Sequence, residues 1–395
     1  MMPLTGITVL DLTRVLSGPY CTMQLADMGA RVIKIEQPGK GDDTRRWGPP
    51  FVEGESSYFM SVNRNKESVT LDFKQAEGRR ILDALLAKAD VLVENFRPGT
   101  LAKLGLDYAS LAAAHPRLVY CSISGFGQTG PRRREPGYDA VMQGEAGLMS
   151  ITGNDDGPPF RLGVAIADIA TGMFATQGVL LALLARERTG RGQAIDLGMH
   201  DAVTALLTYQ AGIYFTTNQA PARMGNRHPT IVPYETLSGS DGDFVLAVGN
   251  DDLWRRFCGA TGLDHLVDDA RFSTNPLRVR HYADLKPLLD AAMATGTRQH
   301  WIERLTQAGV PCGSVRDLAE VFADPQVAAR DMVVEVEHAI AGAQRVLGIP
   351  VKLSATPGSV RTAAPTLGQH TERVLIHDVG LGADAIPALR QSGVI

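Results

Sequence analysis

Short runs rich in Val and Ile alternate with helix-like patterns along the first half of the chain, and this alternation most narrows the possible folds. Continuous apolar runs of this length are typical of parallel strands buried on both faces, which need crossover helices between them. The sequence therefore predicts an α/β fold, with a Rossmann-like large domain around a parallel sheet. We expect its strands at residues 7–12, 31–36, 68–73, 91–94, 118–122 and 193–197.

Between these strands, apolar spacing and suitable end residues predict helices at 18–28, 76–87, 139–149 and 169–186. A stretch rich in Gly, Pro and Asn around 223–233 indicates a boundary. We therefore expect a large domain at 1–200 completed by 345–395, a linker or crossing segment at 201–233, and a smaller α+β domain at 234–344. The later segments predict strands at 244–249, 332–336 and 345–353, and helices at 371–379 and 384–392.

The composition is that of a soluble globular chain, with 44% hydrophobic and 21% charged residues among 395. A net charge of −4 without a Lys/Arg run argues against nucleic acid or an anionic membrane as partner. Four widely separated cysteines predict neither a metal site nor a disulfide framework, and no secretion signal opens the sequence, so we expect a cytoplasmic location. The most apolar segment contains Asp168, Thr171, Thr176 and Gln177, which favours a core helix over a membrane span.

The first strand–turn–helix invites a nucleotide-binding interpretation, because the N-terminus of a helix can hold phosphate. Only Gly18 lies in that turn, so neither the dinucleotide-binding nor the P-loop glycine pattern is met. The glycine-bearing stretches 122–131 and 224–229 could bring backbone close to a ligand, but ordinary turns have the same composition. Glycine alone therefore assigns no cofactor.

Asp168 interrupts the apolar, small-residue stretch 163–172. A carboxylate in such surroundings must be paired, hydrogen-bonded or used chemically. One interpretation is an N-cap for the helix that follows; another is a catalytic nucleophile, kept ionised by the helix N-terminus. The residues alone leave both interpretations open.

Several motifs run in order along nearly the whole chain. They occupy residues 9–36, 41–50, 61–73, 93–99, 122–131, 136–143, 163–172, 189–199 and 367–375, and include VENFRPG, SISGFGQTGP and GVAIADIATG. The chain thereby resembles the class III CoA transferases, the family of formyl-CoA transferase and carnitine CoA transferase (CaiB/BaiF type). The segments GDDTRRWGPPF and SVNRNK are most similar to the branch that includes succinate–hydroxymethylglutarate CoA transferase.

The resemblance implies that Asp168 is the catalytic nucleophile. Its carboxylate would attack an acyl-CoA donor to give a mixed anhydride, and an aspartyl-CoA thioester would then pass CoA to a free carboxylic acid. Covalent catalysis of this kind splits one difficult exchange into steps that each retain activation. Coenzyme A and acyl-CoA are substrates in this scheme, which uses no metal and no permanently bound cofactor.

The resemblance also assigns binding residues by position. Coenzyme A contacts are expected at Leu16, Ser17, Leu71, Lys74, Asn95, Phe96, Lys103 and Met199, and the acyl pocket at Trp47, Tyr58, Tyr138 and Gly225. One departure is Gln37, where some family members have an Arg that contacts the 3′-phosphate. The family further implies an interlocked homodimer, with CoA bound at the domain junction.

Two other classes of function stay open. The α-methylacyl-CoA racemases of the same superfamily use a His–Asp acid–base pair, but the residue before Asp139 is Tyr138, whose ordinary pKa near 10 suits that task poorly. A non-catalytic CoA-binding protein is the second alternative. The acceptor acid is also open: a dicarboxylate is suggested by the nearest branch, with Arg45, Arg46, Arg161, Arg227 and His228 as candidate partners of its distal carboxylate.

Overall fold

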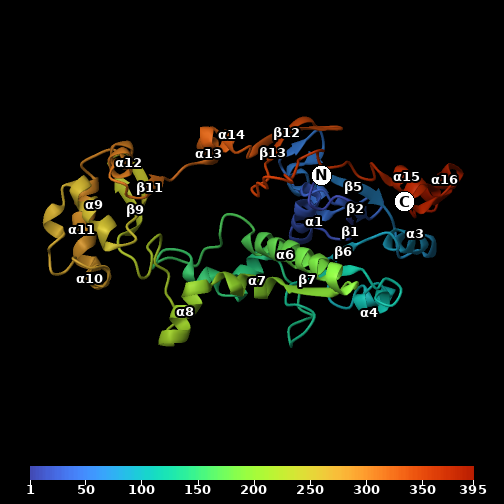
Figure 1. Cartoon of the computed structure of the whole chain (residues 1–395), viewed down its shortest axis with the longest axis horizontal. Coiled ribbons are helices and arrows are strands. Elements are labelled where there is room, and N and C mark those ends of the chain that lie inside the picture. The colour runs from blue at the N-terminus through green and yellow to red at the C-terminus, as the bar shows by residue number, and fades with distance from the viewer. The chain divides into compact units, whose positions relative to one another are not determined.

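Figure 1 shows the computed structural model, which describes residues Met1–Ile395. The chain divides into two compact units that each collect distant segments of the sequence. Unit 1 contains Met1–Leu148, Leu162–Ala211 and Pro325–Ile395, and unit 2 contains Met149–Arg161 and Gly212–Asp324. These bounds differ from the expected ones at 149–161 and 325–344, and the expected linker 201–233 is divided between the two units after Ala211. The second difference has a visible cause, since Arg64 of unit 1 donates a hydrogen bond to the Leu347 carbonyl at the end of the hairpin formed by residues 333–347.

Unit 1 is built on a parallel sheet in the order β5-β2-β1-β6-β7-β8. The strands are β1 (Thr8–Asp11), β2 (Arg31–Glu36), β5 (Lys66–Thr70), β6 (Val91–Glu94), β7 (Val119–Ser124) and β8 (Ala194–Gly198). Each of the six expected strands is present, with bounds that differ by at most three residues. The α/β prediction with a parallel sheet is therefore confirmed.

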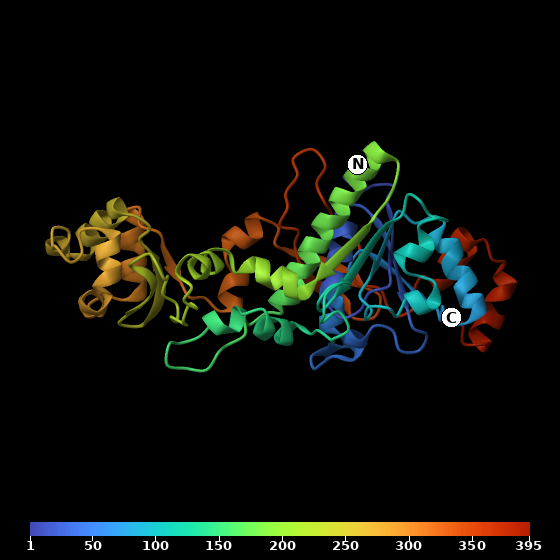
Figure 2. The same ribbon diagram turned by 90° about the horizontal axis from the view of Figure 1, so that it is seen from below.

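Helices cover both faces of this sheet. Successive side chains of a strand point to opposite faces, so Val9 and Val93 pack with helices α1 (Ser17–Asp27) and α6 (Ile166–Thr189), whereas Leu10 and Leu92 pack with α3 (Ala76–Leu86). Figure 2 shows α6 as the long green helix that lies along the sheet. The near-continuous apolar strands follow from this double coverage, because neither face meets water.

The remaining elements of unit 1 are short. They are β3 (Phe51–Val52), β4 (Glu55–Ser56), α2 (Ser57–Val62), α4 (Tyr108–Leu111), α5 (Asp139–Glu145), α7 (Met199–Leu206), α14 (Pro325–Ala329), β12 (Val333–His338), β13 (Gly342–Leu347), α15 (Thr371–Val374) and α16 (Ile386–Gln391). The C-terminal segment is bonded to β5, because the Thr70 amide donates to Thr371 Oγ1 at 3.0 Å. Helix α8 (Thr208–Thr217) contains the boundary between the two units.

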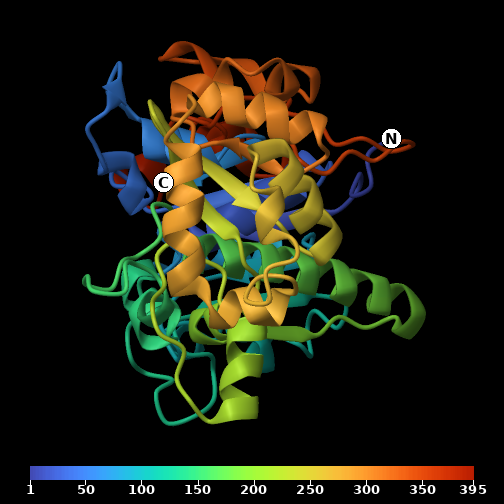
Figure 3. The same cartoon turned by 90° about the vertical axis from the view of Figure 1, so that its left-hand side faces the viewer.

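Unit 2 combines a three-stranded antiparallel sheet with several helices. Its strands are β9 (Tyr234–Gly239), β10 (Gly242–Ala247) and β11 (Cys312–Ser314), and its helices are α9 (Asp251–Thr261), α10 (Asn275–Arg280), α11 (Tyr282–Met293), α12 (Arg298–Gln307) and α13 (Leu318–Phe322). Figure 3 shows helices gathered beside the strands. A core of its own, which includes Trp254, Phe257 and Phe272, makes this unit compact.

Helix α6 is the one helix long and apolar enough to cross a membrane, judged by length and composition, and 44% of its most apolar stretch is buried. A core helix of a soluble protein passes the same test. Here one side of α6 packs on α1, β7 and β8. Four large apolar side chains on its other side, those of Met173, Leu180, Leu181 and Leu184, are exposed.

Candidate functional site

Asp168 lies in the first turn of α6 but does not cap it. The helix begins at Ile166, its N-cap is Ala165, and no side chain of that residue accepts a capping bond. Instead, Asp139 of α5 reaches across and its Oδ1 accepts the Ala167 amide at 2.8 Å. The N-cap interpretation of Asp168 is therefore wrong. Because a neighbouring helix satisfies this terminal amide, the Asp168 carboxylate is left available for other contacts.

The surroundings of Asp168 hold its pKa near neutrality. The residue is only 8% exposed, and this burial raises the pKa of the carboxyl to about 7, with a further contribution from the negative charge of Asp139. Hydrogen bonds from the Ser17 hydroxyl and amide act in the opposite direction, because they stabilise the anion. Asp168 therefore passes between its acid and its nucleophilic carboxylate form close to pH 7.

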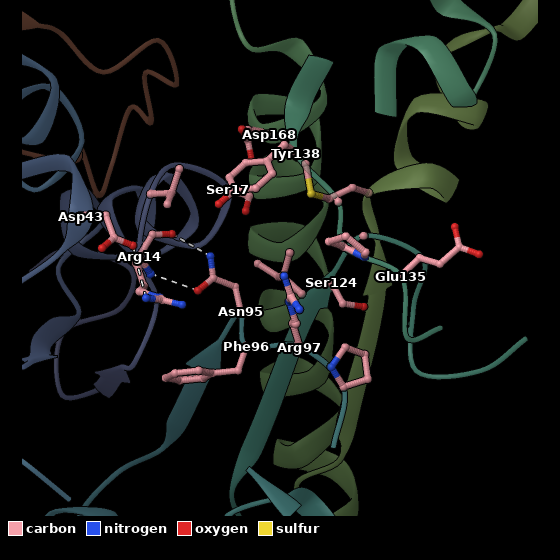
Figure 4. A pocket seen from close by; sticks show the side chains of 17 residues that line it. Arg14, Ser17, Asp43, Asn95, Phe96, Arg97, Ser124, Glu135, Tyr138 and Asp168 are labelled. Atoms are coloured by element: carbon pink, nitrogen blue, oxygen red, sulfur yellow. Dashed lines mark hydrogen bonds and ion pairs between the residues drawn. The ribbon is translucent and has the colours of Figure 1, made fainter. Parts of the chain in front are cut away.

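Asp168 lines a pocket together with five of the residues expected to contact the substrates. These are Ser17, Asn95, Phe96, Tyr138 and Met199. Figure 4 shows Asp168, Tyr138 and Ser17 close together, with Asn95 and Phe96 further along the same pocket. Ser17 follows β1, Asn95 follows β6 and Met199 follows β8, so the pocket opens at the carboxyl edge of the parallel sheet. Ligands of open α/β sheets bind at this edge.

Two aromatic residues expected at the acyl pocket contact each other, and one of them lies near Asp168. Trp47 and Tyr58 form an edge-to-face pair with ring centroids 5.2 Å apart. Burial raises the pKa of Tyr58 to about 12, and the charges of Asp168 and Asp139 contribute to that increase. Tyr58 is therefore within electrostatic reach of Asp168 and stays protonated at neutral pH.

Other expected contact residues lie elsewhere. Leu71 is in the core at 1% exposure, and Leu16 is buried beside Tyr58, so neither side chain lines the pocket. Lys74 and Lys103 are exposed on the surface of unit 1, also outside the pocket. Gly225 belongs to unit 2, where it has a φ of 59° and lines a polar pocket of that unit.

The pocket also contains polar residues that the sequence did not single out. Arg97 has no hydrogen bond or ion pair to its guanidinium, whereas the other pocket guanidinium, that of Arg14, pairs with Asp43 at 3.2 Å. Ser124 is buried and its hydroxyl also has no partner. Arg97 stands inside the VENFRPG motif, directly after a strand, and this position at the sheet edge was a usable signal for it.

The pocket lining contains no histidine, and the Tyr138 that precedes Asp139 is 64% exposed. Both Asp139 carboxylate oxygens accept hydrogen bonds, one from the Ala167 amide and one from the Gln143 side chain at 2.8 Å. Asp139 is thus a structural acceptor, and the His–Asp pair that a racemase mechanism requires is missing from this pocket. The structure holds no group of three or more His, Cys, Asp or Glu side chains arranged to bind a metal ion.

Comparison with known proteins agrees with this geometry. The model of CoA-transferase family III matches residues 4–371. The chain is 43% identical to the succinyl-CoA:glutarate CoA-transferase of Mus musculus, over all of this chain and 91% of the relative. It is also 43% identical to the succinate–glutarate CoA-transferase of Agrobacterium fabrum, over 94% of this chain and 95% of the relative.

A crystal structure of a CaiB/BaiF family protein from Brucella suis superposes with a TM-score of 0.84 at 43% identity, covering 95% of this chain and 99% of that one. A parallel sheet with a pocket at its carboxyl edge that contains Asp168, together with these matches, defines an acyl-CoA-dependent transferase. The chain belongs to CoA-transferase family III. The resemblance inferred from its motifs is confirmed.

Proposed function

We propose that this enzyme moves CoA from succinyl-CoA, or a similar donor, to a dicarboxylic acid through covalent intermediates on Asp168. The observation that carries the proposal is the position of Asp168: a carboxyl group whose pKa is about 7 shares one pocket with Ser17, Asn95, Phe96 and Met199. A nucleophile beside expected CoA contacts can reach the thioester end of a bound acyl-CoA.

The chemistry balances without an added proton or electron carrier. An Asp168 oxygen attacks the donor's thioester carbonyl, the C–S bond breaks, and CoA thiolate leaves a mixed anhydride. The thiolate then attacks the aspartyl carbonyl and releases the donor acid. The acceptor carboxylate next attacks this aspartyl thioester, and the released thiolate takes the new acyl group while Asp168 is regenerated. Each intermediate keeps the activation of a thioester, so the exchange has no large uphill step.

The surroundings suit these steps. Asp168 lies in the first turn of α6, where the positive end of the helix dipole favours its anion. Burial removes the hydration shell of the carboxylate and limits access of water to an anhydride. Ser17 lies beside Asp168 in the pocket, and its hydroxyl and amide favour the carboxylate form, which lowers the pKa of Asp168.

We further propose that the distal carboxylate of the acceptor binds Arg97. Both relatives described above carry glutarate in their names. Arg97 brings an unpaired guanidinium into the Asp168 pocket, and such a group binds a carboxylate in a bidentate manner. Arg45, one of the arginines considered from sequence, is already bound to Glu36 at 2.7 Å, so it is occupied.

An exchange assay with succinyl-CoA tests both parts of this proposal. We expect the wild-type enzyme to form new acyl-CoA with glutarate, and Arg97→Met to lower kcat/KM for glutarate by roughly 10- to 100-fold, the equivalent of one charged hydrogen-bonded contact. Pentanoate, which has no distal carboxylate, is the matched control. The kcat/KM for pentanoate should fall less than about threefold in Arg97→Met. An equal loss with both acids, together with a higher KM for succinyl-CoA, would instead place Arg97 at the CoA phosphates.

The pH dependence of the wild-type enzyme follows from Asp168. Only the carboxylate attacks, and its pKa is about 7, so kcat/KM should rise about tenfold per pH unit below pH 7 and level off above it. The carboxyl groups of glutarate titrate more than one pH unit below 7, so the acceptor does not mask a limb centred near pH 7. The measurement is kcat/KM between pH 5.5 and 8.5; a flat profile would contradict a buried carboxyl nucleophile.

A homodimer in the cytoplasm completes the proposal. The exposed apolar row on α6, formed by Met173, Leu180, Leu181 and Leu184, is the surface that a second copy would cover, as the family resemblance implies. All four cysteines are free thiols, which suits a reducing compartment. Native mass spectrometry tests the assembly, and a compact folded monomer would refute it.

A further inference from the structure

The turn between β1 and α1 adopts a backbone conformation that its sequence disfavours. Val15 has a φ of 69°, in the left-handed region that β-branched residues almost never occupy. Strain of this kind persists only where the surroundings over-determine the backbone, and it clusters at functional sites. Val15 and Ser17, two residues further on, both line the Asp168 pocket.

Side chains from outside the turn form hydrogen bonds with its backbone amides and carbonyls. Lys34 Nζ donates to the Thr13 carbonyl at 2.7 Å, and the Val15 amide donates to Asp42 Oδ1 at 3.1 Å. The amide and carbonyl of Arg14 bond reciprocally with the Asn95 side chain, at 3.0 and 2.7 Å. Three consecutive residues are thus fixed by partners from β2, from the loop after β2, and from the end of β6.

Lys34 and Asp42 also bind each other. Their side chains are completely buried, with Lys34 Nζ 3.0 Å from Asp42 Oδ2. Burial alone would lower the pKa of Lys34, but the carboxylates of Asp42, Asp11 and Glu36 that face it raise its pKa overall. Asp11 and Glu36 are themselves paired, with Lys66 and Arg45. The Lys34–Asp42 pair therefore stays charged and bridges two separate points of the turn.

The start of α1 is packed tightly against the same turn. A Cβ on Gly18 would lie 2.4 Å from Thr13 Cβ, so glycine is required for this close approach. Ser17, which precedes Gly18, lies beside Asp168 in the same pocket, where its amide and hydroxyl lower the pKa of that carboxyl (Figure 4). A shift of Thr13 or Val15 is consequently transmitted to the two donors that hold the nucleophile.

We infer that Lys34 and Asp42 are positioning residues of the reaction, which lock the Thr13–Val15 turn in its strained form so that Ser17 holds Asp168 in line for attack. The inference rests on the proposed function of Asp168 as nucleophile. The backbone strain at Val15 is its second support, because an unstrained turn would not need a buried ion pair to keep it in place.

A rescue experiment separates positioning from stability. Asp42→Asn keeps a carbonyl oxygen for the Val15 amide but removes the charge opposite Lys34, so Val15 can relax and Ser17 moves. We expect kcat to fall roughly 10- to 100-fold, the usual cost of a misplaced reacting group. The acidic limb of the pH profile should also move to higher pH. The interactions with Ser17 lower the pKa of Asp168, and they weaken in this variant. The other titratable groups near Asp168, Asp139 and Tyr58, are unchanged.

Val15→Gly, added to Asp42→Asn, should restore much of the lost kcat, since glycine adopts the left-handed φ without strain. The acidic limb of the pH profile should return to its wild-type position. If Asp42→Asn does not fold, Asp42→Glu keeps the charge and displaces the carboxylate, and the same losses are expected. Asp27→Asn is the matched control, because it breaks the buried Arg64–Asp27 pair at the far end of α1 and should lower Tm without moving the limb.

An unchanged kcat and limb in a folded Asp42→Asn enzyme would overturn the inference. So would a Val15→Gly substitution that restores Tm but not kcat. Exchange activity of the wild-type enzyme, measured in parallel, keeps this test separate from the proposed function: no exchange in the wild type would refute CoA transfer itself.

Discussion

Asp168→Asn should lower kcat for CoA transfer at least ~10³-fold, because an amide oxygen cannot attack a thioester as a carboxylate does. Binding of acyl-CoA should persist, since Ser17, Asn95, Phe96 and Met199 are untouched. The measurement is single-turnover exchange from succinyl-CoA to glutarate, with acyl-CoA binding followed by calorimetry. Turnover within tenfold of the wild type would remove Asp168 from the mechanism.

The same substitution should stabilise the protein at alkaline pH. The pKa of Asp168 is raised from 3.8 to about 7 in the folded state, so the folded state binds this proton more tightly than the unfolded chain does. The stabilisation that protonated Asp168 contributes to the folded state is therefore present in full below pH 4, and it is lost as pH rises through 7. A neutral Asn avoids that loss, so Tm of the variant should exceed that of the wild type by several degrees at pH 8, on the order of 2 kcal/mol, and the two should converge near pH 4. A variant less stable than the wild type at pH 8 would contradict this account.

Lys66→Met should produce the largest loss of stability. Lys66 Nζ lies 3.1 Å from Asp11 Oδ2, both side chains are fully buried, and the same ammonium group donates to the Pro19 carbonyl at 2.9 Å. Removal of this partner leaves the buried Asp11 carboxylate with hydrogen bonds from Thr13 and Thr22 and the charge of Lys34 but without its ion pair, so we expect a cost of about 3 kcal/mol, the lower end of the range for a broken buried pair. Urea unfolding at pH 7 measures the change in the free energy of unfolding.

The matched control is Arg80→Met on α3. Arg80 pairs with Glu77 at 3.1 Å, but its side chain is 79% exposed, so its loss should change stability by less than about 1 kcal/mol. Equal effects of the two substitutions would show that water reaches the Lys66–Asp11 pair.

The strands of unit 1 could be predicted from the sequence, because local patterns and tertiary environment agree there. The first three residues of β6 (Val91–Glu94) are apolar and the strand lies in the middle of the sheet between β1 and β7, so its pattern predicted its place. The boundaries between the two units could not be predicted from the sequence. Residues 149–161 pack with unit 2 through contacts such as Arg223 Nη2 to the Gly157 carbonyl at 2.8 Å, and no local pattern records so distant a partner.

The site was partly predictable for the same reason. Asp168 was visible as an acid inside an apolar stretch, but the choice between a cap and a nucleophile depended on Asp139, which precedes it by 29 residues and takes over the helix amide. Leu71 was assigned by position, yet its side chain is only 1% exposed and packs in the core with Val69 and Ile81. The position of Arg97 after β6 was visible in the sequence, but that its guanidinium has no partner is seen only in three dimensions.

Isotope transfer into Asp168 tests the covalent mechanism most directly. Glutarate labelled with ¹⁸O in its carboxylates is turned over with succinyl-CoA, and the peptide that contains Asp168 is then analysed by mass spectrometry. The account predicts that one ¹⁸O atom enters the Asp168 carboxylate, because the anhydride oxygen supplied by the acceptor stays with the aspartate when CoA thiolate takes the acyl group. Exchange that proceeds at its normal rate without label in Asp168 would contradict it.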